Sequence, residues 1–129
     1  MQAELKWLTD PTIFQVNRLD AHSDHVSYAP GDGLFAGVSS LRQSLDGRWL
    51  FTWSRNPAQR PADFWREGFD VSGFGTIQVP GHMEMQGWGQ IHYTDTLYPW
   101  DGHAEVQPPE IDWEDAPVGS YIREFDLAP

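Results

Sequence analysis

The stretch Leu45-Asp-Gly-Arg-Trp-Leu-Phe-Thr-Trp53 predicts the first strand of this protein. Its Asp-Gly pair is typical of a tight turn or a bulge. The rings of Trp49, Phe51 and Trp53 alternate with other side chains, so all three rings share one face of an extended strand. We interpret this aromatic face as part of the core rather than as a platform for a ligand.

Two more strands are predicted further along the chain. The segment Gly75–Pro80 places Ile77 and Val79 on one face, and residues 119–127 alternate in the same way. Residues 61–68 begin with proline and end with glycine, which indicates a short helix or a turn. Three or four strands with long connections make an unfinished antiparallel sheet. Because a sandwich or jelly roll closes its core with about seven or eight strands, we expect a mainly β domain that is truncated.

Residues 1–40 indicate an extended N-terminal arm. The Asp-Pro pair at 10–11 predicts a turn, and Phe14, Val16 and Leu19 are apolar anchors without a sustained helical or strand period. Such an arm cannot form a core by itself. It must therefore lie on this domain or on another one.

The composition argues against several classes of function. A net charge of −11 disfavours nucleic acid and anionic membrane surfaces as partners. The chain has no cysteine, which excludes a disulfide framework and agrees with a cytoplasmic protein. We find no signal peptide, and no apolar run approaches the roughly twenty residues of a transmembrane helix.

Residues 80–102 combine aromatic rings, histidines, carboxylates and glycines with almost no positive charge. A sugar needs ring faces for its C–H groups and fixed acceptors for its hydroxyls. Asp95 lies among Tyr93, Tyr98 and Trp100, so it is a candidate acceptor for a sugar hydroxyl. On the residues alone, a turn or cap role for Asp95 remains the favoured alternative.

Other chemistry has weaker support in the sequence. A glycosidase needs two carboxylates at the scissile bond, but with 19 acidic residues the presence of a pair is uninformative, and we interpret Glu84, Asp101 and Glu105 as solvated or capping groups. His22 and His25, with an aspartate between them, are the nearest approach to a metal cluster, yet their spacing fits no zinc motif. We interpret them as loop histidines bonded to the backbone.

The order of several segments resembles the N-terminal part of the long β-galactosidases of glycoside hydrolase family 2. The matching segments run over nearly the whole chain and comprise Trp7–Pro11, Gln15–Leu19, Ala21–His22, Ser40–Phe51, Asn56–Pro57, Val79–His82, Met85–Gly87, Tyr93–Pro99, Pro108–Pro109 and Pro117–Tyr121. Several ordered motifs at family-like spacing make this resemblance specific.

The resemblance implies a multidomain enzyme. In that family a jelly-roll, galactose-binding-like β-sandwich comes first, and two catalytic glutamates lie in a later TIM barrel, where magnesium and sodium assist retaining hydrolysis of terminal β-D-galactosides such as lactose. Residues 41–129 then correspond to the first part of the sugar-binding jelly roll, truncated, and residues 1–40 to the arm. On this resemblance, the chain is expected to contain no catalytic residue, to bind neither ion fully and to be inactive alone. Its expected partners are the sugar, the remaining domains and further copies of the enzyme.

Two residues carry over from the resemblance. Asp95 stands where the family loop at the galactose pocket usually has asparagine, and it keeps the acceptor but loses the amide donor. Asp10 matches a position near the barrel's magnesium, with contact through water. Two alternatives remain open: a stand-alone carbohydrate-binding module, and a subunit without hydrolase activity that completes a partner chain.

Overall fold

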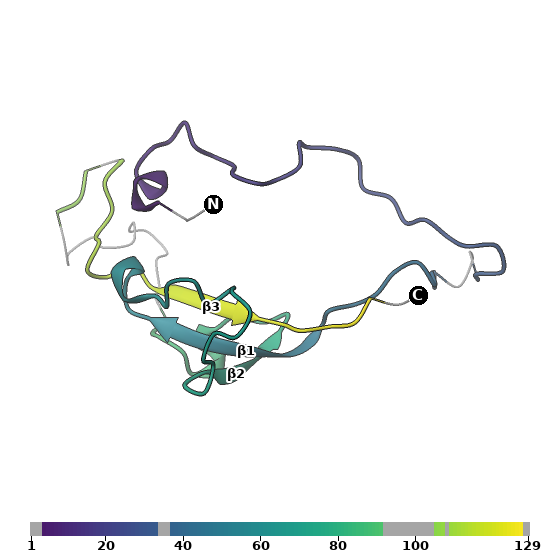
Figure 1. Cartoon of the computed structure of the whole chain (residues 1–129). Helices are drawn as coiled ribbons and strands as arrows, with labels where there is room; N and C mark the ends of the chain where they lie inside the picture. Colours follow the sequence, from purple (N-terminus) through teal and green to yellow (C-terminus); the bar gives the residue numbers. More distant parts are fainter. Residues whose placement is uncertain (1–3, 34–36, 92–104, 108, 128–129) are drawn as a thin grey trace.

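The computed structural model describes residues 4–33, 37–91, 105–107 and 109–127, and within them the protein is mainly β. Figure 1 shows three strands that form one antiparallel sheet, in the order β2-β1-β3. The strands are β1 (Gly47–Ser54), β2 (Gly75–Val79) and β3 (Val118–Ile122), and short 3₁₀ helices are η1 (Leu5–Leu8), η3 (Pro57–Gln59) and η4 (Glu84–Gln86). The predictions of a mainly β fold and of the first two strands are confirmed.

Phe51, in the middle of the central strand, is the centre of the core. Its side chain is 0% exposed, and Ile77 in β2 is 2% exposed. The rings of Tyr121 and Trp88 pack edge-on against Phe51, with centroids 4.7 and 4.9 Å away. Gly119 lies so close that a Cβ there would be 2.8 Å from Cε2 of Phe51. The core is therefore a tight aromatic cluster between neighbouring strands.

The other two rings of β1 are less buried than the sequence predicted. Trp49 and Trp53 are both only half-buried, so Phe51 is the one fully buried ring of the three that were predicted as core. Trp88 covers the middle of this face by packing on Phe51. Trp49 instead donates from its Nε1 to the carbonyl of Leu45, 2.8 Å away. Alternation set the direction of the rings, but burial depends on what lies over them.

The last strand is shorter than predicted, because β3 ends at Ile122 rather than at 127. Beyond it, the Arg123 guanidinium donates to the carbonyl of Arg48 at 2.6 Å, and the Gln43 amide donates to the carbonyl of Asp126 at 2.8 Å. Side chains thus replace backbone pairing where the C-terminal residues run beside the entry to β1 (Figure 1).

Residues 61–68 form turns, which is one of the two structures the sequence indicated. The amide of Arg66 donates to the carbonyl of Asp63 at 2.9 Å, and that of Phe69 donates to Arg66 at 3.2 Å. Asp63 has a φ of 58°. A left-handed residue at this place interrupts the helical backbone, so a continuous helix cannot form.

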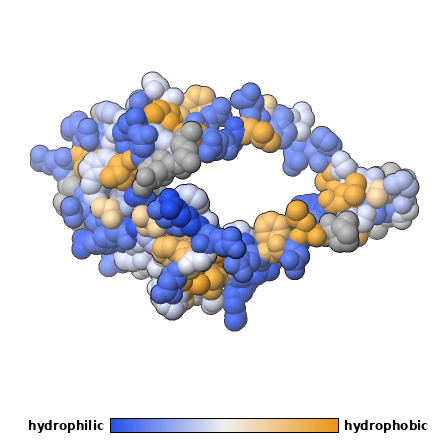
Figure 2. Space-filling view, viewed as in Figure 1, coloured by the Kyte–Doolittle hydropathy of each residue, from blue (hydrophilic) through white to orange (hydrophobic). Residues whose placement is uncertain are grey.

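The described parts of the predicted arm, residues 4–33 and 37–40, contain η1 and turns but no strand. Figure 1 shows the arm as a long purple arch that begins at η1 and runs away from the strands, and Figure 2 shows an opening between the arch and the sheet. Phe14 and Leu19 are each 79% exposed. An extended arm over residues 1–40 stays a prediction. Within the described residues, no helix has the length and apolar character needed to cross a membrane.

The carboxylate of Asp32 links two segments near the C-terminal end of the arm. One carboxylate oxygen accepts hydrogen bonds from the amides of Ala29, at 2.7 Å, and Ser40, at 3.0 Å. These two bonds, the one from Ala29 first, hold the pKa of Asp32 below its usual value of 3.8. They favour the ionised form, as amide donors to a carboxylate do.

We expect the hydrogen bonds from the amides of Ala29 and Ser40 to Asp32 to break at acidic pH. The pKa of Asp32 is lower in the folded state than in the unfolded state. The stabilisation by its ionised carboxylate is therefore complete above about pH 3.8 and is lost as the pH falls through the folded-state pKa. The measurement is a pH titration of the Ala29 and Ser40 amide shifts by NMR. The transition should have a midpoint below 3.8 and should be absent from Asp32→Asn. A midpoint at or above that value would contradict the proposed cause.

Candidate functional site

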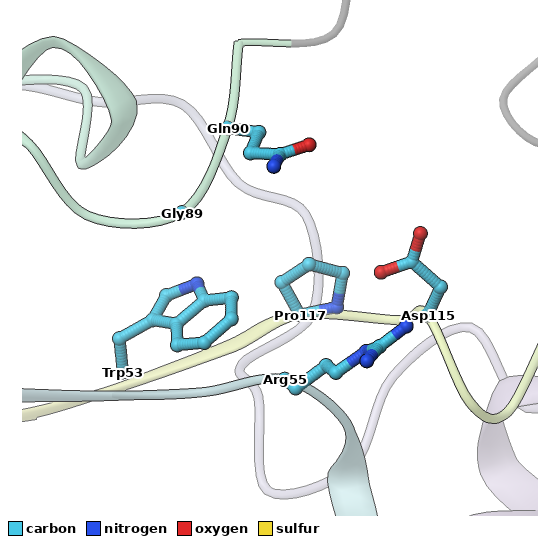
Figure 3. A pocket seen from close by; sticks show the side chains of 6 residues that line it. All are labelled: Trp53, Arg55, Gly89, Gln90, Asp115 and Pro117. Atoms are coloured by element: carbon cyan, nitrogen blue, oxygen red, sulfur yellow. The ribbon is translucent and has the colours of Figure 1, made fainter.

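A cavity of about 460 Å³ opens at the end of β1 (Figure 3). Three segments that are distant in sequence meet there: the end of β1, the turn after η4 and the approach to β3. The residues that line the cavity are Trp53, Arg55, Gly89, Gln90, Asp115 and Pro117. The antiparallel register explains the meeting, because Trp53 of β1 pairs with Gly119 of β3 and thereby brings residues 115–117 beside it.

Trp53 and Gly89 form the tightest contact of the cavity wall. A Cβ on Gly89 would be 2.9 Å from Nε1 of Trp53, so only glycine lets the backbone lie against the indole. Gly89 also has a φ of 73°, which favours glycine. Nε1 of Trp53 is buried and has no hydrogen-bond partner in the described part of the protein. A ligand oxygen would reach this nitrogen only if Gly89 moved, so the indole offers ring surface rather than its N–H group.

Polar groups of three kinds surround the indole. Figure 3 shows the amide of Gln90 above the ring and the guanidinium of Arg55 extending toward Asp115, whose carboxylate is at the opposite side of the cavity. Arg55 is exposed and Asp115 is half-buried. A guanidinium donates hydrogen bonds, a carboxylate accepts them and an amide does both. With the ring surface, this combination suits a neutral ligand that carries several hydroxyl groups.

Among the described residues, the cavity lining lacks the pair of carboxyl groups that glycoside hydrolysis needs. Hydrolysis with retention requires two carboxyl groups about 5–5.5 Å apart. Among the described residues that line the cavity, Asp115 supplies the single carboxylate. The arrangement therefore supports recognition of a ligand rather than cleavage.

Of the two predicted site residues, the structure describes Asp10 but not Asp95. Asp95 lies outside the described residues, so its contact with sugar stays a prediction. Asp10 is described, and its Oδ1 accepts hydrogen bonds from the hydroxyl of Thr12 at 2.6 Å and from the amide of Thr12 at 3.0 Å. These bonds, the hydroxyl first, lower the pKa of the Asp10 carboxyl. Its local role is to cap a turn, and a water-mediated metal contact stays a prediction.

No group of three histidine, aspartate or glutamate side chains gathers to hold a metal ion within the described ranges. Magnesium keeps several waters and is bound through one or two carboxylates, so a single carboxylate such as that of Asp10 suits a contact through water, which stays a prediction. The Nδ1–H of His22 donates to the carbonyl of Asp20, 2.8 Å away. This confirms the interpretation of His22 as a loop residue bonded to the backbone.

The sequence predicts few of the cavity residues. Trp53 is predicted as core, and Gln90 lies in the stretch 80–102. No motif marks Arg55 or Asp115. The signal that could have found them is positional, because Arg55 follows one strand and Asp115 precedes another. In an antiparallel pair the end of one strand lies beside the start of the next, so residues at those two places meet.

The chain is similar to one known domain family and to several known proteins. Residues 42–129 match the family described as "Glycosyl hydrolases family 2, sugar binding domain". The chain is 48% identical to a β-galactosidase of Lactobacillus delbrueckii subsp. bulgaricus over 126 residues, which cover 98% of this chain and 12% of that enzyme. It is 46% identical to a β-galactosidase of Halalkalibacterium halodurans, over 97% of this chain and 12% of that protein. It is also 46% identical to a β-galactosidase large subunit of Leuconostoc lactis, over 98% of this chain and 22% of that subunit. The chain thus spans only a small part of the length of these relatives.

Proposed function

The chain belongs to the sugar-binding domain family of the family 2 glycosyl hydrolases, and from this membership we propose that it forms the sugar-binding part of a β-galactosidase. The observation that carries the proposal is the family match over residues 42–129, together with 48% identity to a β-galactosidase over 126 residues of the chain. The cavity beside Trp53 supports it, because ring surface and hydrogen-bonding groups suit a hydroxyl-rich ligand.

The proposed reaction is retaining hydrolysis of terminal β-D-galactosides such as lactose, with both catalytic glutamates outside this chain. Magnesium and sodium would supply electrostatic assistance at the barrel site, where Asp10 would be an outer contact. The chain's own residues bind and orient: Arg55 and Gln90 donate to hydroxyl groups, and Asp115 accepts. We further propose that Asp95 contacts the galactose, that the enzyme assembles from several copies, and that it acts in the cytoplasm.

A second candidate function is a complementing subunit. It is favoured by the names of two relatives, the β-galactosidase large subunits of Leuconostoc lactis and Latilactobacillus sakei. A large subunit acts with another subunit, so this chain could complete a partner without hydrolysing sugar itself. Mixing the chain with an inactive β-galactosidase that lacks the matching segment distinguishes the two, because recovered activity would favour complementation.

The proposed function is tested with a chimera, in which this chain replaces the matching 126 residues of the Lactobacillus delbrueckii enzyme. We expect the chimera to hydrolyse o-nitrophenyl β-D-galactoside and the chain alone to be inactive. Normal turnover by the chain alone would contradict the proposal. So would an inactive chimera that elutes from size-exclusion chromatography like its parent. If the chimera does not assemble, the smaller exchange of residues 42–129 provides the same test.

Replacing Asp95 with alanine in the chimera should lower kcat/KM by about ten- to a hundredfold, mainly through a higher KM. A hydrogen bond to a charged group contributes roughly 1.5–3 kcal/mol, and each 1.4 kcal/mol changes affinity about tenfold. Steady-state kinetics measure the effect. Asp126→Ala is the matched control, because Asp126 is exposed and does not line the cavity. An unchanged kcat/KM would assign Asp95 to a turn.

A further inference from the structure

The side-chain amide of Gln86 occupies the outer edge of β2. The amide of Gln78 donates to Oε1 of Gln86 at 2.7 Å, and Nε2 of Gln86 donates to the carbonyl of Gln78 at 2.9 Å. Both backbone groups of one strand residue are thus paired by one side chain. A neighbouring strand would make the same two bonds. Since β1 pairs with the other side of β2, Gln86 takes the place of a strand at this edge.

The turn that carries Gln86 is built closely around its amide. A Cβ on Gly81 would be 2.7 Å from Nε2 of Gln86, so a larger residue would displace the amide. The same Nε2 also approaches the carbonyl of His82 at 3.4 Å. Gly87, directly after Gln86, has a φ of 86° and ends η4. The backbone on both sides of Gln86 therefore depends on residues without side chains.

The residues that follow Gln86 reach the core and then the cavity. Trp88 packs edge-on against Phe51, 4.9 Å between centroids, and its ring would be 3.0 Å from a Cβ on Gly75. Gly89 and Gln90 come next and form one wall of the cavity. Gln86 is thus the polar link that fixes this wall to β2, three residues before the wall begins.

We propose that Gln86 is a positioning residue: its amide closes the outer edge of β2 and sets the place of the cavity wall formed by Gly89 and Gln90. The proposal rests on the proposed function, because it takes the ligand of that wall to be the galactoside. Gln86 is exposed and does not line the cavity. Its bonds compete with water, so their loss lowers stability only modestly. What is lost is the fixed position of the turn, and a misplaced binding group weakens ligand binding more than it weakens the fold.

The test compares Gln86→Ala with Met85→Ala in the chimera. Met85 is 74% exposed and lies in the same helix, so its substitution controls for side-chain truncation. We expect Gln86→Ala to raise KM for the galactoside on the order of tenfold, to leave kcat within about twofold, and to remove hydrogen-exchange protection at the Gln78 amide. Met85→Ala should change none of these. Unchanged KM, or unchanged protection of Gln78, would overturn the proposal. A lower kcat together with a higher KM and a lower thermal stability would also overturn it, because that pattern indicates a purely structural role.

Gln86→Glu adds a pH-dependent readout. A glutamate carboxylate can accept from the Gln78 amide but cannot donate to the Gln78 carbonyl, whereas a protonated carboxyl can do both. The ratio of variant to parent KM should therefore approach one as the pH is lowered toward the glutamate pKa, ordinarily about 4.3. Gln86→Ala should show no such recovery, and an equal trend in both variants would count against the amide bonds. If the chimera hydrolyses no galactoside, the proposed function fails by itself. Hydrogen exchange at Gly89 and Gln90 in the same variants then decides the positioning role: faster exchange in Gln86→Ala supports it, and equal exchange overturns it.

Discussion

Replacing Phe51 with alanine is expected to lower the free energy of unfolding by about 3–5 kcal/mol, the usual loss for a fully buried phenylalanine. Phe51 is 0% exposed and contacts rings from β3 and from the turn after η4. Truncation would leave a cavity where Trp88 and Tyr121 now pack edge-on. Domains unfold with about 5–15 kcal/mol in total, so this single change should remove a large share of the stability.

Few other buried groups could compensate for that loss. Among the described residues, Phe51 and Ile77 are the buried hydrophobic side chains. The glycine at position 119 packs against the Phe51 ring and cannot extend into the space that the ring would leave. Tyr121 of β3 and Trp88, which lies against Gly75 of β2, would therefore lose their shared contact with Phe51. We expect β2 and β3 to separate from β1 together.

The measurement is a urea titration followed by tryptophan fluorescence and circular dichroism. Phe14→Ala is the matched control, because the same substitution there affects a side chain that is 79% exposed. We expect the control to change the free energy of unfolding by about 0.5 kcal/mol or less. Equal unfolding midpoints for the two variants would show that Phe51 is not the centre of the core.

The alternation of rings predicted β1 and the burial of its middle residue, but not what covers its ends. Strand period is a local property, whereas burial depends on segments distant in sequence. Residues 123–127 show the same limit. They alternate like a strand, but by the register of Leu50 with Ile122 the partner of residue 124 would be Arg48. The Arg48 carbonyl is instead bound by the Arg123 side chain. A pattern without an available backbone partner does not make a strand.

The candidate site was less predictable than the fold for a related reason. The sequence drew attention to residues 80–102, where chemistry-bearing side chains are dense. The cavity takes Gly89 and Gln90 from that stretch, and its charged groups, Arg55 and Asp115, come from two other segments. Neither residue has a distinctive sequence context, because each is placed by the sheet register rather than by a motif. Membership in the family 2 sugar-binding domains indicates a class of ligand, which these isolated residues could not indicate by themselves.

Replacing Gly89 with alanine is expected to destabilise the protein by about 2–4 kcal/mol, as the sum of two effects. The first is backbone strain: Gly89 has a φ of 73°, and an alanine there costs about 1 kcal/mol. The second is overlap, because the new Cβ would be 2.9 Å from Nε1 of Trp53. Overpacking of this kind costs about 1–3 kcal/mol. The indole belongs to the central strand, so we expect the turn to move rather than the ring.

Gly87→Ala separates the two effects within the same turn. Gly87 has a φ of 86°, but a Cβ there would meet no atom within 4 Å. It should therefore show the strain alone, and Gly89→Ala should be less stable than Gly87→Ala by about 1–3 kcal/mol. Displacement of the wall should also raise KM in the chimera for Gly89→Ala, since Gly89 lines the cavity beside Trp53. Urea unfolding and steady-state kinetics measure the two quantities. Equal stability and equal KM in the two variants would show that Gly89 is required only for its backbone conformation and that its contact with Trp53 does not shape the cavity.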